Sequence, residues 1–172
     1  MTLRFFTPPA RPGNEADRLA RLRSLHLLDT PPDPVLDGIV KAAAAIFGAP
    51  IGLVSLIDAD RQWFKAKSGL DAPQTPRAIS FCGHAILEPE PFVVLDSRSD
   101  TRFAGNPLVV GDPTVIFYVG VPLITADGHA IGTLCIIDHQ PRGDIEPAQL
   151  LAAKALAARA IAHIEAAAAA MP

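Results

Sequence analysis

The chain has 172 residues, of which 49% are hydrophobic and 19% charged, and its formal net charge is −3. This length suits one domain whose hydrophobic core needs no disulfide or metal ion. The acidic balance gives no basic surface for nucleic acid, and no apolar stretch has the length of a signal peptide or a membrane span. We therefore expect a cytoplasmic protein that binds neither nucleic acid nor membrane. The two cysteines lie far apart, which favours reduced thiols.

The first helix is expected after a flexible N-terminal segment, residues 1–13, and opens a single domain that covers residues 14–172. Asn14 is a suitable capping residue, and Asp17 falls in the first turn, where the helix dipole favours a carboxylate. Leucines then recur at near-helical spacing, which predicts an apolar stripe. These are Leu19, Leu22, Leu25 and Leu28.

A second helix and two strands follow. Asp33 with Pro34 is a helix start, because proline is tolerated at the first helical position, and Gly48 ends the helix. Residues 51–57 are apolar on both faces, which is typical of a strand in the middle of a sheet. Residues 62–67 have mixed polarity, which predicts a strand nearer the edge.

The second half contains three more strands and a long helix. Residues 92–95 form a short strand, and 115–121 and 130–137 form long strands joined by a turn with an Asp-Gly pair. The last helix begins near Pro147 and runs into five alanines. Since helices and strands do not alternate, the order predicts an α+β fold with an antiparallel sheet.

Two segments carry a motif. Residues 76–87 read Pro-Arg-Ala-Ile-Ser-Phe-Cys-Gly-His-Ala-Ile-Leu, and Gly-Val-Pro-Leu at 120–123 is followed by Gly-Thr-Leu-Cys-Ile-Ile-Asp at 132–138. Together they resemble the core of a GAF domain, the sensory module found N-terminal to histidine kinases and diguanylate cyclases. The similarity extends over residues 15–165 and includes Arg-Gln-Trp-Phe-Lys at 61–65.

The resemblance implies a fold and a role. GAF domains have a five- or six-stranded antiparallel sheet, with terminal helices on one face and a segment on the other that closes a ligand pocket. The implied function is a non-enzymatic bacterial signal-transduction domain, which binds a small molecule or responds to redox state. Two alternatives stay open: an enzyme similar to the free methionine-R-sulfoxide reductases, and a dimerisation module with a vestigial pocket.

The covering segment contains the first candidate site residues. Ser80 is placed to cap a short helix over residues 81–87, which puts Cys82 in its first turn, where unpaired N–H groups lower a thiol pKa. The alternative is that Cys82 is a small buried hydrophobe. His84 falls on a different face of the helix, so we expect a hydrogen-bonded histidine under the pocket cover and no Cys-His dyad. Phe81, which precedes Cys82 in the motif, is also a candidate ligand-binding residue.

Four further candidates lie beyond this helix. The stretch from Asp96 corresponds to a pocket wall in GAF domains, although an aspartate before serines is also a common turn former. Arg102 is either a ligand for an anion or a solvated arginine, and Phe103 is expected to face the pocket. In the strand, alternation sends one of Phe117 and Tyr118 into the core and the other into the pocket. The predicted ligand-binding residues are thus Phe81, Cys82, His84, Asp96, Arg102, Phe103 and Tyr118, with no catalytic residue and no metal ligand.

Known GAF chemistries leave the cofactor open. The loop 103–107 and the segment 114–123 contain neither the catalytic cysteine nor the acidic residue of the reductases. The Asp-Ile-Pro signature of bilin-binding GAF domains is absent, and the cyclic-nucleotide signature has no clear counterpart. Haem ligation through His84 or His129 stays open on ligand grounds.

The apolar stripes predict a partner. The helices that contain residues 19–28 and 150–164 offer more apolar surface than one sheet face needs, which favours a homodimer through the terminal helices. Because GAF domains usually precede an output domain, we also expect a signalling output protein acting in trans.

Overall fold

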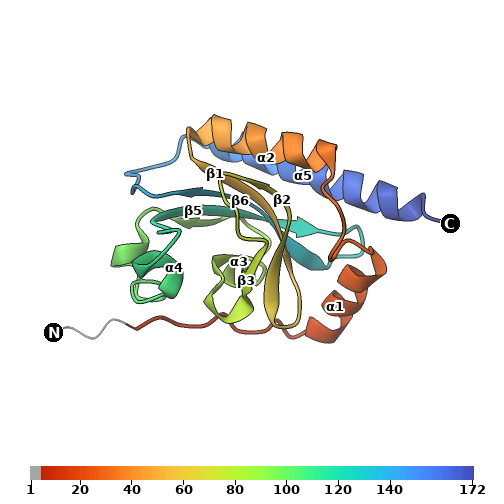
Figure 1. The fold of residues 1–172 in the computed structure, drawn as a ribbon, viewed down its shortest axis with the longest axis horizontal. Coiled ribbons are helices and arrows are strands. Elements are labelled where there is room, and N and C mark those ends of the chain that lie inside the picture. Colours follow the sequence, from red (N-terminus) through yellow and green to blue (C-terminus); the bar gives the residue numbers. More distant parts are fainter. Residues whose placement is uncertain (1–4) are drawn as a thin grey trace.

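A six-stranded antiparallel sheet forms the central layer of the computed structural model, which describes residues 5–172 (Figure 1). The strand order is β3-β2-β1-β6-β5-β4. This architecture confirms the predicted α+β fold. The strands are β1 (Ile51–Ile57), β2 (Arg61–Ser68), β3 (Gln74–Pro76), β4 (Phe92–Val94), β5 (Phe117–Ile124) and β6 (Ala130–Asp138).

The centre of the sheet is apolar on both faces, as predicted. All residues of β1 are buried, and β1 pairs with both β2 and β6. β5 and β6 form the predicted hairpin, in which Gly128 adopts a φ of 89° that favours glycine. Phe117 belongs to the core cluster under the helices and Tyr118 to the cluster on the opposite face, which confirms the predicted alternation.

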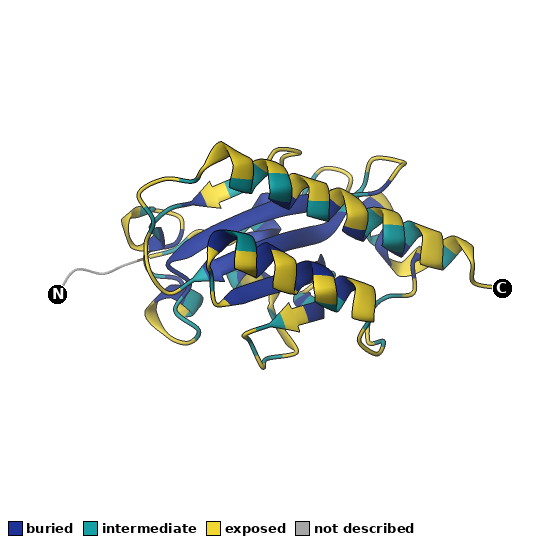
Figure 2. Ribbon diagram, turned by 90° about the horizontal axis from the view of Figure 1, so that it is seen from above, coloured by how far each residue is buried: buried dark blue, intermediate teal, exposed yellow. Residues whose placement is uncertain are grey.

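Helices α2 (Pro34–Phe47) and α5 (Pro147–Ala169) lie side by side over one face (Figures 1 and 2). The Asp33 side chain accepts hydrogen bonds from two backbone N–H groups at the start of α2, and Gly48 ends the helix in a left-handed conformation. α2 packs close to the sheet, because a Cβ atom on Gly52 would lie 2.3 Å from the Val40 carbonyl oxygen. Figure 2 shows the helices buried on the sheet side and exposed on the outer side.

Helix α1 (Glu15–Ser24) lies at one end of the sheet (Figure 1). Leu22 and Leu25 are buried in the same cluster as the inner faces of α2 and α5. Asn14 precedes the helix but its side chain makes no capping hydrogen bond, and the helix ends before Leu28. The predicted leucine stripe is therefore largely used inside the domain.

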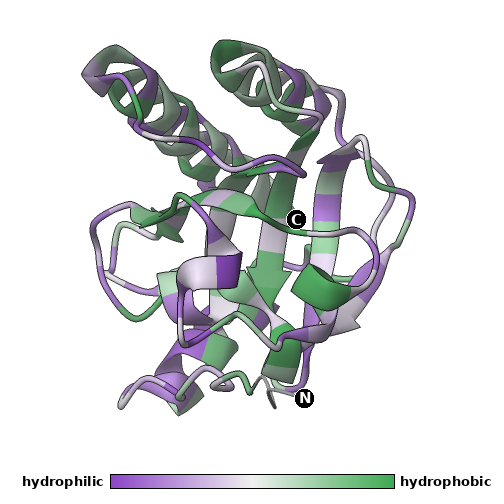
Figure 3. Ribbon diagram, turned by 90° about the vertical axis from the view of Figure 1, so that its left-hand side faces the viewer, coloured by the Kyte–Doolittle hydropathy of each residue, from purple (hydrophilic) through white to green (hydrophobic). Residues whose placement is uncertain are grey.

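The other face is covered by the segment between β2 and β5, which we call the cover, residues 69–116. It contains β3, η1 (Arg77–Ile79), α3 (Phe81–Ala85), β4, η2 (Ser97–Ser99) and α4 (Pro107–Val110). Figure 3 shows hydrophobic strands lying between the paired helices and this cover.

The N-terminal segment lies against the cover. The Thr7 N–H donates to the Arg102 carbonyl oxygen at 2.9 Å, and the Gly105 N–H donates to the Phe5 carbonyl oxygen at 3.0 Å. These bonds hold Phe5 and Thr7, which belong to the segment we expected to be flexible, while residues 1–4 lie outside the described residues. Among the described helices, none combines the length and apolar character that a membrane span requires.

Candidate functional site

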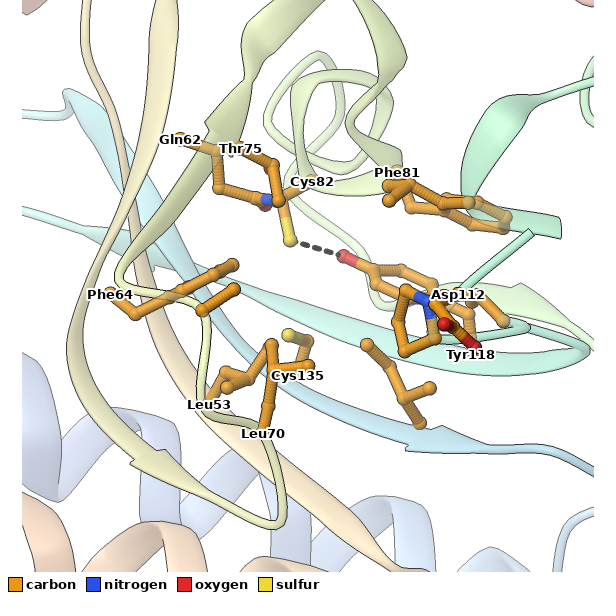
Figure 4. A pocket seen from close by; sticks show the side chains of 15 residues that line it. Leu53, Gln62, Phe64, Leu70, Thr75, Phe81, Cys82, Asp112, Tyr118 and Cys135 are labelled. Atoms are coloured by element: carbon orange, nitrogen blue, oxygen red, sulfur yellow. Dashed lines mark hydrogen bonds between the residues drawn. The ribbon is translucent and has the colours of Figure 1, made fainter.

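A cavity of about 190 Å³ lies between the sheet and the cover (Figure 4). Its floor comes from β1, β2, β5 and β6, and its rim from segments 70–75 and 108–113. Most of the lining is aliphatic or aromatic. The polar groups are those of Gln62, Thr75, Cys82, Asp112 and Tyr118. Among the described residues, no lysine, arginine or histidine lines this cavity.

Cys82 is positioned by helix α3. The Ser80 hydroxyl accepts a hydrogen bond from the Gly83 N–H at 3.1 Å, which confirms the predicted cap. The Cys82 side chain is buried, with 2% of its surface exposed to bulk solvent, and lines the cavity. Burial of Cys82 agrees with the interpretation as a buried hydrophobe, and its reactivity stays a prediction.

Two hydroxyl groups donate to the Cys82 sulfur. Tyr118 Oη lies 3.0 Å from Sγ and Thr133 Oγ1 lies 3.1 Å from it. Burial alone raises the pKa of the thiol, but hydrogen bonding from Cys135, Thr133 and Tyr118 outweighs this effect and lowers the pKa to about 7. Cys82 lies in the first turn of α3, as predicted, and these side-chain donors act on it in addition to that position.

Cys135 lies on β6 and lines the same cavity. The neighbouring Cys82 sulfur, together with burial, raises the pKa of the Cys135 thiol well above its ordinary value. The Tyr118 and Thr133 hydroxyls donate to Cys82, and hydrogen bonding from Thr133 offsets the rise at Cys135 only in part. Of the two thiols in the cavity, Cys82 is the one whose anion is stabilised.

Tyr118 reaches Cys82 because its neighbour on the same face of β5 is a glycine. A Cβ atom on Gly120 would lie 2.2 Å from the Tyr118 hydroxyl, so the ring can lie along the strand only over a glycine. Burial raises the pKa of Tyr118 well above its usual range, and the adjacent Cys82 contributes. The hydroxyl therefore stays a neutral donor.

Gln62 forms the polar part of the wall at the β2 side. Its Oε1 accepts a hydrogen bond from the Ser55 hydroxyl at 2.7 Å, and its Nε2 donates to Thr75 Oγ1 at 2.9 Å. These bonds join β1, β2 and β3 across the wall. Because both ends of the amide are satisfied within the protein, this wall is rigid and offers little free hydrogen-bonding capacity.

An aromatic cluster supports the cover behind the cavity. Phe81 and Phe103 stack with ring centroids 4.0 Å apart and planes 9° apart, and Phe103 is completely buried. His84 packs edge-on against Phe103, and its Nε2 lies 3.0 Å from the Thr7 carbonyl oxygen. Desolvation lowers the pKa of His84. Phe103 and His84 therefore hold the wall in place without lining the cavity.

Asp96 and Arg102 lie away from the cavity, around a shallow depression on the surface. The Asp96 carboxylate accepts hydrogen bonds from the Arg98 backbone N–H and guanidinium, which is the turn role considered above. Arg102 pairs with Asp100 and lies over the Phe92 ring at 5.0 Å. Each charge is thus satisfied locally.

Three of the seven predicted residues line the cavity, namely Phe81, Cys82 and Tyr118, whereas His84, Asp96, Arg102 and Phe103 do not. Sequence reasoning missed Gln62 and Phe64, although their alternation on a half-buried strand was a usable signal. It also missed Leu70, Leu108 and Asp112 on the rim. In the described part of the chain, no group of three or more His, Cys, Asp or Glu could hold a metal ion.

Sequence comparison assigns the family. The GAF domain profile matches residues 31–164. The chain belongs to the GAF domain family. The GAF match covers the whole sheet, the cover and most of α5, so the cavity described above lies entirely within it.

The chain is also similar to part of a larger enzyme. The GAF domain is 48% identical over 139 residues to a cyclic di-GMP phosphodiesterase of Pseudomonas aeruginosa, a match that covers 81% of this chain and 24% of the relative. The chain therefore spans about a quarter of that protein.

Solved structures share the GAF fold at lower identity. The GAF domain of an Acinetobacter phosphoenolpyruvate-protein phosphotransferase superposes with a TM-score of 0.66 at 20% identity, over 93% of this chain and 98% of that one. The free methionine-R-sulfoxide reductase of Neisseria meningitidis, solved in complex with its substrate, has a TM-score of 0.64 at 19% identity, over 99% and 100%. At these identities the likeness concerns the fold alone.

Proposed function

We propose that this GAF domain is a sensory domain whose cavity binds a small, neutral and mostly apolar molecule. The observation that carries the proposal is the cavity of about 190 Å³ with its largely aliphatic and aromatic lining. An engineered apolar cavity of about 150 Å³ binds benzene. The available space therefore suits one substituted ring.

Charge argues against anionic ligands. The Asp112 carboxylate at the rim is the charged group among the described lining residues, and no cationic side chain balances an anion there. Burying an unpaired anion costs on the order of several kcal/mol. This disfavours cyclic nucleotides. Haem is disfavoured too, because His84 hydrogen-bonds outside the cavity and His129 lies in the β5–β6 turn.

For the output, we propose control of cyclic di-GMP turnover. The support is the 48% identity to part of a cyclic di-GMP phosphodiesterase. The catalytic unit would lie either elsewhere in a longer protein or in a partner acting in trans. A cytoplasmic location fits this role, since cyclic di-GMP phosphodiesterases act on a nucleotide second messenger.

We also propose a homodimer, whose interface is formed mainly by α5. Leu22 of α1 and Leu25, which follows the helix, are buried within the domain, so this region offers less apolar surface than its sequence suggests. On α5, Leu151 is 70% exposed. An exposed leucine on an alanine-rich helix is compatible with close approach of a second copy.

We propose no reductase activity. The loop from Phe103 to Pro107, which lacks the catalytic cysteine, serves structural ends here: Phe103 stacks on Phe81, and the Asn106 side chain caps α4. The nucleophile that would attack the sulfoxide from that loop is therefore missing.

The ligand proposal is tested with benzene, indole and p-cresol as probes and cyclic GMP as an anionic comparison. Binding is followed by NMR chemical shifts and by thermal stabilisation, which amounts to about 2.7 kcal/mol at a probe concentration 100 times Kd. We expect Leu108→Trp, which fills the cavity from α4, to abolish binding. Val110→Trp, on the same helix but exposed, is the matched control. Failure of every neutral probe to bind, or equal binding by Leu108→Trp, would refute the proposal.

A further inference from the structure

We propose that Cys82 is a modification site that captures small apolar α,β-unsaturated carbonyl compounds, such as enones and benzoquinones, inside the GAF cavity. This inference rests on the proposed function, because the cavity must first admit a small neutral molecule. It goes further in naming the reactive group and the chemical class of ligand.

The first support is the environment of the sulfur. Tyr118 Oη at 3.0 Å and Thr133 Oγ1 at 3.1 Å both donate to Cys82 Sγ. Each hydroxyl has one proton to donate, and each lies within hydrogen-bond distance of this sulfur. A neutral thiol is a weak acceptor, whereas two converging donors suit a thiolate. The lowered pKa, about 7, agrees with this geometry.

The second support is independent of the cysteine and comes from the space around it. Figure 4 shows the Cys82 sulfur directed toward the Tyr118 hydroxyl, within the ring of side chains that encloses the cavity. Phe64, Phe81 and Leu53 supply apolar walls that concentrate neutral, weakly hydrated molecules beside the sulfur. Charged reagents are not favoured there, since no cationic lining group would offset the desolvation of an anion.

The chemistry needs no oxidant and no second substrate. The Cys82 thiolate adds to the β-carbon of the unsaturated carbonyl compound, so that a carbon–sulfur bond forms and the electron pair of the C=C bond moves to the carbonyl oxygen as an enolate. The enolate then takes one proton from water, which replaces the proton that the thiol released on ionisation. The sum is one thiol plus one enone giving one thioether, with no atom lost.

Cys135 is an internal control for this assignment. It lines the same cavity and is equally buried, but the Tyr118 and Thr133 hydroxyls donate to Cys82, and the pKa of the Cys135 thiol is raised. If access alone decided reactivity, both cysteines would react. Hydrogen-bond stabilisation of the thiolate instead predicts a single adduct, on Cys82.

The test incubates the full chain with 2-cyclohexen-1-one at pH 7 and follows adducts by intact mass and peptide mapping. We expect one adduct, on Cys82, whose rate rises through pH 7. Cys135→Ser, which keeps a hydrogen-bond donor beside Cys82, should still give the adduct, and Cys82→Ser should give none. Tyr118→Phe and Thr133→Val should each slow the reaction about fivefold at pH 7, because a rise of one unit from a pKa of about 7 lowers the thiolate fraction from about one half to about one tenth. An unmodified wild type, equal modification of Cys135, or Tyr118→Phe reacting at the wild-type rate would each overturn the inference.

A separate arm distinguishes this failure from failure of the proposed function. Cys82→Ser is titrated with benzene, which cannot react. Benzene binding by Cys82→Ser, with no enone adduct on the wild type, would refute capture and leave the sensory cavity standing. No benzene binding by either protein would refute both.

Discussion

Glu15 joins helix α1 to the cover, and its replacement by glutamine gives the strongest stability prediction. Its carboxylate accepts hydrogen bonds from Arg18 at 3.0 Å and from Arg77 at 3.1 Å. The side chains of Arg18 and Arg77 are only 1% and 5% exposed, and that of Glu15 is 16% exposed. Glu15→Gln therefore leaves two buried guanidinium groups without a counter-charge.

The expected loss follows from these contacts. Removing one partner of a buried ion pair costs about 3–5 kcal/mol. Here Arg18 keeps a hydrogen bond to the Ile57 carbonyl oxygen at 2.8 Å and Arg77 keeps one to the Asp58 carbonyl oxygen at 3.0 Å. Since the glutamine also retains an acceptor, we expect the free energy of unfolding to fall by about 2–3 kcal/mol. For a chain of this size, that lowers Tm by roughly 5–10 °C.

Urea unfolding, followed by circular dichroism, measures the change. The control is Asp60→Asn, which removes the exposed pair with Arg11, in which the aspartate side chain is 91% exposed. Such surface pairs contribute about 0–1 kcal/mol. A loss below about 1 kcal/mol for Glu15→Gln, or a loss equal to that of Asp60→Asn, would show that the buried-pair reasoning is wrong.

The same residue predicts a pH dependence. Burial alone raises the pKa of Glu15, but hydrogen bonds and charges from Arg77 and Arg18 outweigh it and lower the pKa from 4.5 to about 2. A lowered folded-state pKa means that this stabilisation is complete above pH 4.5 and is lost as the pH falls toward 2. Wild type should therefore lose stability relative to Glu15→Gln across that window, and parallel curves would contradict the assignment.

Four further predictions concern the cavity and the surface. Phe103→Ala should reduce the free energy of unfolding by about 3–5 kcal/mol in urea, against less than about 0.5 kcal/mol for exposed Val110→Ala, and equal effects would contradict the stacking role. Gly120→Ala should displace Tyr118 and raise the pKa of Cys82, measured from the pH dependence of its reaction with a thiol reagent. An unchanged pH profile would contradict this role of Gly120. Sedimentation at micromolar concentration should detect a homodimer, and a monomer with no concentration dependence would exclude it. Turnover of free methionine-R-sulfoxide at about one per second or faster would refute the absence of reductase activity.

Local chemistry explains which elements could be predicted from the sequence. Helix α2 begins after Asp33, whose side chain caps it, and ends at Gly48, which adopts a left-handed conformation. Both ends depend on local residues, so the sequence suffices to predict them. Strand β3 has only three residues and helix α4 only four. Elements so short show no periodicity in the sequence by which they could be identified. β3 exists because it pairs with β2, where Arg61 opposes Pro76, which is a tertiary contact.

The cavity was only partly predictable for the same reason. Tyr118 followed from alternation on a long strand, and Cys82 from a motif. The rim residues Leu70, Leu108 and Asp112 lie in connections whose path is set by packing of the whole cover. Phe103 was expected to face the ligand, yet a fully buried aromatic is better satisfied by stacking on Phe81 at 4.0 Å than by lining a cavity.

Glu15 also shows how the cavity connects with the terminal helices. Arg77 belongs to η1, and its carbonyl oxygen accepts the Ser80 hydroxyl at 2.7 Å, immediately before the helix that carries Cys82. At the other end of α1, Arg21 pairs with Glu165 of α5 at 2.9 Å. Polar contacts at the two ends of α1 therefore connect this helix with the segment before α3 and with α5, whereas the apolar clusters lie on opposite faces of the sheet. Glu15, which the stability test removes, thus joins the segment before α3 to the helix whose other end contacts α5, because its carboxylate pairs with Arg77 and Arg21 pairs with Glu165.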